Sequence, residues 1–577
     1  MADADKDGRN NDSGNGNGSV PAPTPAPATK NKRDRENGMF ADSLVDARSE
    51  ELDGLLQRKL DLLFEKNRMM DIFNFIIKHR PGTPVRPHQS VRGSYNAVFG
   101  VEYTDGHAIL RVPLPGSVAF GDEKVRAEVA TMRYIEKMTS VPVPHIYHWG
   151  TAAENPLGLG AFIIMEYIPH AKNLTEVLGV PNVEGGQQKY LDPNVPKDKL
   201  ERMYKQVAGI VLQLSKLEMP KIGSLREEEE GGSFIVGGRP LTKDMNDLVT
   251  MGGIPPAVLP PEDATYRTSD EWYAALADLH VAHLAFQRNN AIASADDCRD
   301  KFVARYLFRQ QARRGKLLAP AHDKSSAAPA AAAADGRPPP GKWREKEKEK
   351  AKEKEKETFR LQIDDFRPHN ILVDADLNVV GVVDWEWAYF APASFARAPP
   401  WWLLLTVPEY WRGTVLDFRD EFAGVLDVFL GALRACEEDE EEEKEAKEAE
   451  DEEEEEEWSI ERHISALSLS PDDDKDAVRL SDRMRWSWEA GDFWAVYAAR
   501  RCYAFEPVFW EFLDERFFGE NVEGGYEGRM HLLSEKAKRR MELLVERKLE
   551  ERKEKKIVDW DPDEAKAYLA EILADLD

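Results

Sequence analysis

The stretch that decides the fold is "IDDFRPHNILVDADLNVVGVVDWEWAYF", residues 363–390. It holds two short β-type runs, "NILVD" and "NVVGVVD", joined by the polar turn "ADLN", and this pattern predicts an antiparallel hairpin. Asn370 begins the first run and Asp384 ends the second. Because the two strands of a hairpin run in opposite directions, these positions lie at the same end of it. The sequence therefore predicts an amide and a carboxylate side by side.

The loop before this hairpin supplies a second carboxylate. Asp365 lies five residues before Asn370. Carboxylate and amide oxygens are the hard donors that Mg²⁺ prefers, and phosphoryl transfer uses such a metal with a loop carboxylate that accepts the proton of the attacking hydroxyl. Asp365 has the spacing for this base, and its neighbour Asp364 would point elsewhere. Taken alone, the Asp-x-x-x-x-Asn spacing is more often a surface turn with side-chain to backbone hydrogen bonds; Asp384 makes the two interpretations comparable.

Upstream residues favour phosphate transfer. "SVRGSYNAVFGVEYTDGHAILRVP", residues 90–113, predicts strands joined by a hairpin turn at "TDG". Arg111 lies in the second run, and Glu128 follows 17 residues later on the apolar face of a helix expected at 122–138. A strand cation paired with a helix glutamate holds nucleotide phosphates in kinase-type enzymes. A structural ion pair would give the same pattern, and the turn at Gly93 lacks G-x-G-x-x-G spacing.

Composition limits the function classes. The net charge is -28, but residues 437–457 hold 17 acids against two lysines, which gives -15 and leaves more than half of the charge in one run that we expect to be solvated and mobile. This balance argues against nucleic acid as a ligand. Three distant cysteines predict no disulfide framework, and no apolar run approaches a membrane span. We expect a cytoplasmic protein, with "KNKRDR" leaving a nuclear location open.

Composition shifts predict eight segments. In order, these are a disordered tail at 1–45, a helical extension at 46–84, a β-rich segment at 85–168, a mainly helical segment at 169–315, a low-complexity insert at 316–357, the hairpin and helices at 358–435, an acidic insert at 436–475, and a helical segment at 476–577.

Together, and in this order, the motifs resemble the aminoglycoside phosphotransferase family, the small-molecule branch of the protein-kinase-like fold, and most closely its fungal members. The family pattern "HGDxxPxN", with "DWE" after a hairpin, reads here "IDDFRPHN" and then "DWEWAYFAPASFARAPPWWLLL". "WEAGDFWAVYAARRCYAFEPVFW" and "WDPDE" strengthen the match. The resemblance implies a two-lobed α+β fold, with a small β-rich N-lobe and a larger helical C-lobe interrupted by charged low-complexity inserts. It implies that 85–168 is a nucleotide-binding N-lobe, that 169–315, 358–435 and 476–577 form a C-lobe, and that the hairpin is its catalytic part.

By position, the resemblance also implies site residues. The catalytic base would be Asp365, the Mg²⁺ ligands Asn370 and Asp384, the ATP phosphate site Gly93, Ser94, Asn96, Arg111 and Glu128, and the adenine contacts the carbonyl of Glu166 and the amide of Ile168. Three positions depart from the family: Ile363 replaces a histidine, Asp364 a glycine and Arg111 a lysine.

The expected function is ATP-dependent transfer of the γ-phosphate to a hydroxyl of a small molecule, with Mg²⁺ as cofactor and no nucleic acid or membrane partner. The alternative is a catalytically weak or inactive pseudokinase that acts as an interaction scaffold, with protein partners bound through the charged inserts. A protein kinase is disfavoured because its "HRD", "DFG" and "APE" signatures are absent.

Overall fold

A computed structural model describes residues 39–45, 47–48, 50–51, 54, 66–93, 95–114, 116–181, 189–228, 231–319, 357–455 and 478–577. Residues 1–38, 320–356 and 456–477, which hold most of the expected tail and parts of both inserts, lie outside these ranges. Ser94 and most of the expected helix between 46 and 65 also lie outside them.

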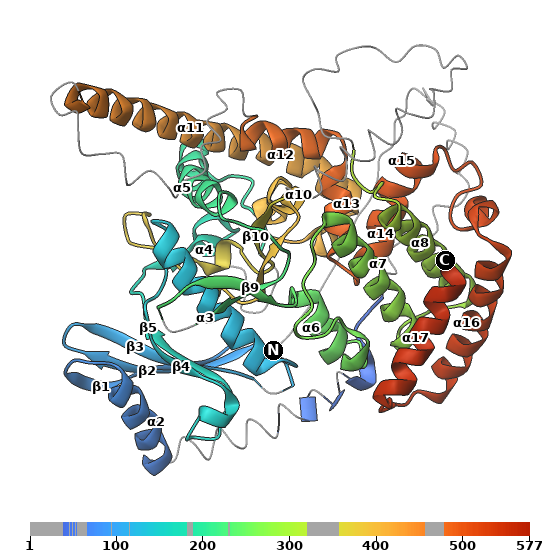
Figure 1. The fold of residues 1–577 in the computed structure, drawn as a ribbon, viewed down its shortest axis with the longest axis horizontal. Helices are drawn as coiled ribbons and strands as arrows, with labels where there is room; N and C mark the ends of the chain where they lie inside the picture. Colours follow the sequence, from blue (N-terminus) through green and yellow to red (C-terminus); the bar gives the residue numbers. More distant parts are fainter. Residues whose placement is uncertain are drawn as a thin grey trace, which may run out of the picture. The chain divides into compact units, whose positions relative to one another are not determined.

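The N-terminal lobe is built on a five-stranded antiparallel sheet with the order β1-β2-β3-β5-β4 (Figure 1). Its strands are β1 Pro84–Arg92, β2 Asn96–Tyr103, β3 Gly106–Pro113, β4 Ile146–Gly150 and β5 Phe162–Glu166. Tyr103 pairs with Gly106 at the tip of β2–β3, so the hairpin predicted at "TDG" is confirmed. Gly106 has a φ of 144°, a conformation that a side chain would strain.

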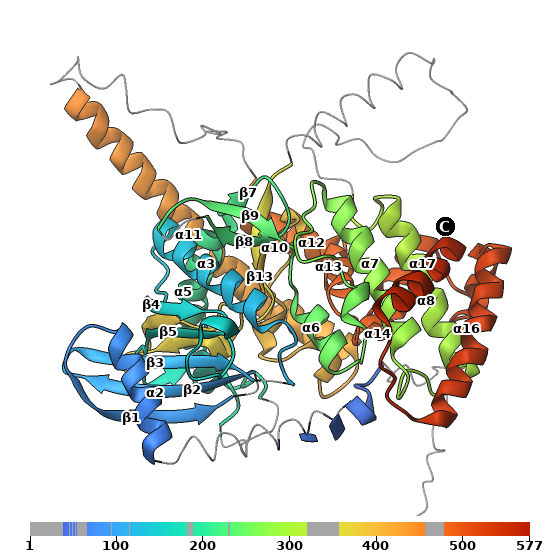
Figure 2. The same cartoon turned by 60° about the horizontal axis from the view of Figure 1, so that its bottom comes forward.

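Two helices cover this sheet from opposite sides. Helix α2, Lys66–His79, packs on the face that carries Phe162 and Ile164 (Figure 2). Helix α3, Gly121–Met138, packs on the face that carries Ile163 and Met165, and it matches the helix expected at 122–138. Successive residues of β5 therefore face different cores, as the period of two in a strand requires.

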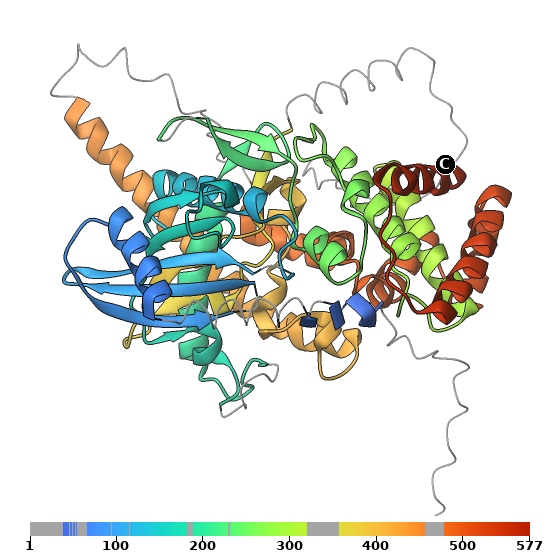
Figure 3. The same cartoon turned by 90° about the horizontal axis from the view of Figure 1, so that it is seen from below.

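The C-terminal lobe is mainly helical (Figure 3). Its helices are α4 Leu174–Leu178, α5 Lys197–Ser215, α6 Lys243–Thr250, α7 Ser269–Phe286, α8 Ala295–Arg313, α10 Ala393–Ala396, α11 Val415–Glu455, α12 Leu480–Glu489, α13 Asp492–Ala499, α14 Phe505–Val508, α15 Asp514–Phe518, α16 Glu535–Glu554 and α17 Pro562–Leu576. Its short strands are β6 Lys172–Asn173, β7 Glu218–Met219, β8 Ser224–Glu227, β9 Phe234–Gly238, β10 Phe359–Ile363, β11 Ile371–Val373, β12 Val379–Val382 and β13 Ala388–Ala391. This α+β arrangement is the fold class expected from the sequence.

The predicted hairpin is β11–β12. The strands are antiparallel, Ile371 pairs with Val382, and the amide of Val383 donates to the carbonyl of Asn370 at 2.9 Å. Asn370 and Asp384 therefore lie at the same end, as expected. A second antiparallel pair, β10 with β13, fastens the chain on either side of this unit. Residues 364–370 join β10 to β11 and are thus held between two sheets. We call them the catalytic loop, after the role expected from the sequence.

The acidic run does not begin as a solvated segment. Helix α11 continues through it to Glu455, and Glu437 is buried. Its carboxylate accepts hydrogen bonds from the backbone amide of Ser481 at 3.1 Å and from the hydroxyl at 2.6 Å. Asp439 pairs with Lys205 of α5 at 2.7 Å. The expectation of a solvated, mobile run is therefore wrong for its first turn, because these acids dock α11 onto α5 and α12.

Candidate active site

A buried arginine gathers the acidic groups of the site. Arg111 is 6% exposed and comes from β3. Its Nη1 lies 2.6 Å from Glu128 Oε1 on α3, and its Nη2 lies 2.9 Å from Asp384 Oδ1. The same Nη2 donates to Glu386 Oε2 at 2.8 Å. The planar guanidinium has several donors in fixed directions, so one side chain can hold three carboxylates. The expected ion pair with Glu128 is confirmed.

Two members of this network were not predicted from the sequence. Glu386 is fully buried, and the Nζ of Lys124 forms an ion pair with its Oε2. Lys124 precedes Glu128 by four residues, so both lie on the same face of α3 and helical spacing could have identified it. Glu386 gave a weaker signal, the acid of "DWE". It lies in a turn and not in a regular strand, since Asp384 and Trp387 have φ values of 64° and 60°, and in this turn its carboxylate faces the same arginine as Asp384.

The catalytic loop holds Asp365 close to the same acids. Asn370 donates its Nδ2 to the backbone carbonyl of Asp365 at 2.9 Å, and the same nitrogen lies 3.5 Å from Asp365 Oδ2. This bond ties the two ends of the loop and leaves the amide oxygen of Asn370 as the atom that could bind a metal ion. Arg367 Nε lies 3.2 Å from Asp365 Oδ1, so a half-exposed cation stands beside the expected base. The structure therefore brings Asp365 and Asn370 together, as the spacing predicts.

Burial and neighbouring charge shift the pKa values of these acids in different directions. Burial, with the negative charge of Glu386, raises the pKa of Asp384. Burial also opposes the charge of Glu386, but the cations Lys124 and Arg111 outweigh it and lower the pKa of that carboxyl. Burial raises the pKa of Asp365, and Arg367 partly offsets the increase. Glu386 is thus a fixed anion, whereas Asp384 and Asp365 are the groups that can exchange protons.

These acids fit a divalent cation. Carboxylate oxygens of Asp365, Asp384 and Glu386 lie within 4.8 Å of one another, and Asn370 adjoins them. Three carboxylates crowded together repel each other, and a hard cation with oxygen ligands relieves that repulsion. In the structure, the positive charge of Arg111 offsets part of this repulsion, because it pairs with Asp384 and Glu386. The donor set therefore suits Mg²⁺, with Glu386 as a group that the sequence did not assign.

The turn between β1 and β2 reaches this cluster. Asn96 donates its Nδ2 to Glu386 Oε2 at 3.2 Å, and its Oδ1 is buried without a hydrogen-bond partner among the described residues. Gly93 closes the turn by donating its amide to the carbonyl of Asn96 at 2.8 Å. Tyr95, at the tip, places its hydroxyl 3.5 Å from Asp247 of α6. The turn therefore extends from the N-terminal sheet to both the acid cluster and the C-terminal lobe.

The residues expected to contact adenine, 166–168, lie at the end of β5, and we call them the hinge. Glu166 ends that strand and pairs with Ala108 of β3. The carbonyl of Ile168 accepts from His170 Nδ1 at 2.9 Å, and its side chain lies against β12. A Cβ on Gly381 would stand 2.4 Å from Ile168 Cδ1, so this close approach requires glycine. The sequence predicted only backbone roles here, whereas the structure also constrains the Ile168 side chain.

Asp364, adjacent to the expected base, points the other way. It is buried, and its Oδ1 accepts from Arg500 Nη2 at 2.5 Å and from the Tyr389 hydroxyl at 3.3 Å. The backbone amide of Lys243 donates to its Oδ2 at 3.2 Å. These bonds fasten the rear of the catalytic loop to α6 and α13. They give a structural role to a residue for which the sequence offered none.

Comparison with known proteins identifies the family. A model of the phosphotransferase enzyme family matches residues 89–395, which is 307 of the 577 positions and more than half of the chain. The chain therefore belongs to the phosphotransferase enzyme family. The match includes every candidate site residue from Gly93 to Asp384. The recognition of aminoglycoside phosphotransferase-type motifs in the sequence is confirmed.

A fungal relative matches only a segment. A subtelomeric hrmA-associated cluster protein of Aspergillus fumigatus is 25% identical over 141 residues, which are 24% of this chain and 24% of that protein. The chain thus spans about a quarter of the length of the curated relative it matches.

Solved structures were also compared. Aminoglycoside phosphotransferase APH(4)-Ia is 13% identical, with a TM-score of 0.33, and the alignment covers 76% of this chain and 99% of that one. A thermostable mutant of it, in ternary complex with AMP-PNP and hygromycin B, is 15% identical, with a TM-score of 0.32 and coverages of 75% and 97%. Macrolide 2'-phosphotransferase type I is 11% identical, with a TM-score of 0.32 and coverages of 75% and 96%.

Membrane-spanning helices were sought as well. Within the described ranges, each helix is too short or too polar to cross a membrane.

Proposed function

We propose that the chain transfers the γ-phosphate of ATP to a hydroxyl of a small molecule. The observation that carries this proposal is the cluster of Asp365, Asp384 and Glu386 oxygens within 4.8 Å of one another, at the end of the β11–β12 hairpin and beside Arg111. Membership of the phosphotransferase family supports the reaction class. The acid cluster supports a metal-dependent form of it.

Each residue of the cluster has a distinct part in this proposal. Asp384, Asn370 and Glu386 would hold Mg²⁺ through their oxygen atoms, and a Mg²⁺ ion bound there would supply charge neutralisation to the phosphates. Arg111, fixed by Glu128, is the residue that would contact the phosphates. Positioning and electrostatic stabilisation account for most catalysis of phosphoryl transfer, so a rigid cluster suits it.

Asp365 is the proposed general base. Its raised pKa brings it closer to the pH at which it works, which favours proton transfer from an acceptor hydroxyl. The bond from Asn370 Nδ2 to its backbone carbonyl fixes the loop, so the carboxylate keeps its place when substrates bind. The proton of the acceptor hydroxyl moves to Asp365 as its oxygen attacks the γ-phosphorus, the bond from the γ-phosphorus to the β,γ-bridging oxygen breaks, and ADP leaves with that electron pair.

The nucleotide would lie between the β1–β2 turn and the hinge. Asn96 and Gly93 stand over the acid cluster, and we assign them, with Ser94, to the phosphates. The Nδ2 of Asn96, which donates to Glu386, can donate to a phosphate oxygen instead. At the other end, the carbonyl of Glu166 and the amide of Ile168 would bind adenine.

One observation favours the alternative of an inactive scaffold. Arg111 Nη2 lies 2.9 Å from Asp384 Oδ1, so the proposed metal ligand already has a cationic partner. A lysine, with a single point charge, would compete less well for three carboxylates. If the ion pair between Arg111 and Asp384 persists, the chain binds no metal and acts as a scaffold that binds partners through its surface.

The test combines binding and turnover. Full-length protein is titrated with Mg·ATP by calorimetry and then incubated with ATP and a mixture of hydroxyl metabolites, with phosphorylated products detected by mass spectrometry. Asp384→Ala should lose metal-dependent nucleotide binding, whereas Asp365→Asn should bind nucleotide but form no product. Absence of Mg·ATP binding by the unmodified protein would overturn the enzyme proposal. Binding without any phosphorylated product would favour the scaffold.

A further inference from the structure

A cavity of about 100 Å³ lies behind the catalytic loop. Its walls come from α5, β10, α10, α12 and α13, and from the segment that carries Trp401 and Trp402. Ile363 and Phe366, which flank the two adjacent aspartates, also line it. Among the described residues, Asp365, Asn370 and Asp384 are not part of its lining. The cavity is therefore separate from the acid cluster.

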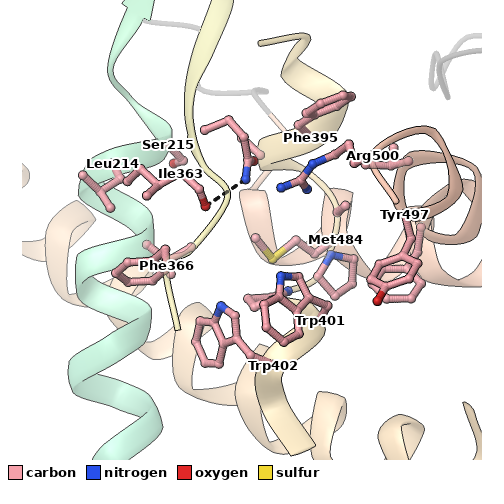
Figure 4. Close-up of a pocket in the computed structure, with 18 of the residues that line it drawn as sticks. Leu214, Ser215, Ile363, Phe366, Phe395, Trp401, Trp402, Met484, Tyr497 and Arg500 are labelled. Carbon is pink, nitrogen blue, oxygen red and sulfur yellow. Dashed lines mark hydrogen bonds between the residues drawn. The ribbon is translucent and has the colours of Figure 1, made fainter. Parts of the chain in front are cut away.

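Aromatic rings make up much of the cavity wall. Figure 4 shows Trp401 and Trp402 on one side, Phe395 and Arg500 on another, and Leu214 of α5 opposite Tyr497. A cavity of about 150 Å³ lined by apolar side chains can bind benzene, so a space of this order suits one ring or a short chain and excludes a nucleotide. Flat aromatic walls favour a planar ligand, because offset and edge-to-face contacts stabilise ring pairs.

The charge of the lining is positive. Arg500 is the only ionised side chain that the described residues contribute to the wall. Its Nη2 donates to Asp364, and its guanidinium lies 5.1 Å from the centre of the Phe395 ring. Its Nε is buried and has no hydrogen-bond partner among the described residues. A buried donor without a partner destabilises the folded chain, and a ligand oxygen that accepts from it would relieve that cost.

Two further arginines stand next in the chain to lining residues. Arg397 lies between Ala396 and Ala398, and Arg483 precedes Met484. Burial, followed by repulsion from Arg483, lowers the pKa of Arg397 to about 10, and burial also lowers the pKa of Arg483. Within the described ranges, neither forms an ion pair with a carboxylate. The chain next to the lining therefore adds two cations to Arg500, while the carboxylates beside the wall, Asp364 and Glu409, already accept hydrogen bonds from Arg500 and Tyr497.

We propose that this cavity is a second ligand site, for a small carboxylate with a planar apolar body. The carboxylate accepts the free Nε–H of Arg500, and the ring packs between the tryptophans and Phe366. Because Arg500 also holds Asp364, the ligand and the catalytic loop share one guanidinium. Binding of the acid weakens the tie between Arg500 and Asp364 and so changes how firmly the rear of the loop is held. This site does not depend on phosphate transfer.

The first experiment measures ligand charge preference. Full-length protein is titrated with 4-fluorobenzoate and, separately, with 4-fluorobenzyl alcohol, and binding is followed by the ¹⁹F signal. A hydrogen bond to a charged group makes us expect the acid to bind about tenfold more tightly than the alcohol. Equal affinities, or no saturable binding of the acid, would overturn the proposal.

Variants then locate the site. Ala398→Leu fills the cavity and should abolish binding of both probes, while Ala446→Leu, the same change at an exposed position of α11, should leave binding unchanged. Asp364→Asn removes the anion that competes for Arg500, so the acid should bind several-fold more tightly and the alcohol should not. Undiminished binding to Ala398→Leu, or unchanged acid affinity in Asp364→Asn, would each refute the proposal. Neither variant removes Arg500, so the result does not depend on its tolerance to substitution.

Discussion

The front and the rear of the catalytic loop carry opposite charge. At the front, four carboxylates, those of Glu128, Asp365, Asp384 and Glu386, face three cations, Arg111, Lys124 and Arg367. At the rear, Arg500 lines a cavity whose described wall contains no carboxylate. The adjacent residues Asp364 and Asp365 separate the two regions, because one side chain points to each. A single loop can therefore present a cation site on one face and an anion site on the other.

The difference lies in how each region balances its charge. The front has more acids than cations, so it is incomplete without an added cation. At the rear, Asp364 accepts from three donors, while the Nε of Arg500 has no hydrogen-bond partner in the described part of the chain. Buried charge must be paired or coordinated. The front is therefore predicted to depend on metal and pH, and the rear on small anions.

The largest effect is expected at the front. Asp384→Asn removes the proposed metal ligand while keeping its shape, and we expect turnover to fall by roughly a thousandfold, or about 4 kcal/mol of barrier. Because burial and Glu386 raise the pKa of Asp384, its charge is disfavoured in the folded chain, so the neutral variant should melt no lower than the parent. Steady-state kinetics and thermal unfolding test the two statements. Full activity would remove Asp384 from the mechanism.

The next effect concerns the balance of charge between Glu386 and Lys124 at the front of the loop. Lys124→Met leaves buried Glu386 with Arg111 as its remaining ion-pair partner among the described residues, and we expect a loss of about 3 kcal/mol in the free energy of unfolding. Lys137→Met changes an exposed lysine on the same helix and should cost less than about 0.5 kcal/mol. Denaturant titration measures both. Adding Glu386→Gln to Lys124→Met should restore part of the loss; no restoration would mean that Lys124 acts through packing alone.

A smaller effect is expected at the hinge, which belongs to neither charged region. Gly381→Ala places a Cβ where Ile168 Cδ1 stands, at 2.4 Å, and should raise the KM for ATP about fivefold, an overpacking cost of about 1 kcal/mol. The change lies away from Asp365, so kcat should be nearly unchanged. Gly424→Ala, in open space on α11, is the matched control and should leave KM as it was. An unchanged KM for Gly381→Ala would place adenine elsewhere.

The smallest effect is a pH dependence that should belong to the front alone. Protonation of Asp384 removes a metal ligand, and its raised pKa brings that protonation to higher pH than for an ordinary aspartate. Mg²⁺-dependent nucleotide affinity should therefore fall about twofold as pH decreases from about 8 to about 7, where half of Asp384 is protonated. Calorimetry across this range measures it. Asp365→Asn, which should still bind nucleotide, is the control, and loss of the pH dependence in that variant would assign the titration to Asp365.

Local sequence patterns predicted the parts of the site that local geometry controls. The two β runs around "ADLN" place Asn370 opposite Asp384, because strand pairing follows directly from the turn. Helical spacing placed Glu128 on the buried face of α3, and the same rule applied to Lys124 would have added it. Glu386 was missed although it lies two residues after Asp384, the spacing that puts side chains on one face of a strand, because it follows the predicted hairpin in a turn where Asp384 and Trp387 have positive φ angles.

No local sequence pattern indicated the contacts between residues that are distant in the chain. Asp364 and Arg500 are 136 residues apart, and Glu437 meets Ser481 across residues 456–477, whose positions the structure does not describe. The acidic run looked solvated because composition reports average charge and not the cations that a neighbouring helix supplies.

By itself, the sequence determined the family, the order of the motifs and the hairpin that unites Asp365, Asn370 and Asp384. These depend on turn chemistry and on periodicities of two and of about 3.6 residues, which act over short stretches of chain. Only the tertiary structure decided which face of the catalytic loop each aspartate occupies, which cations balance Glu386, and that a cavity lies behind Ile363. Such pairings arise when helices and strands distant in the chain pack together, and burial then forces each charge to find a partner.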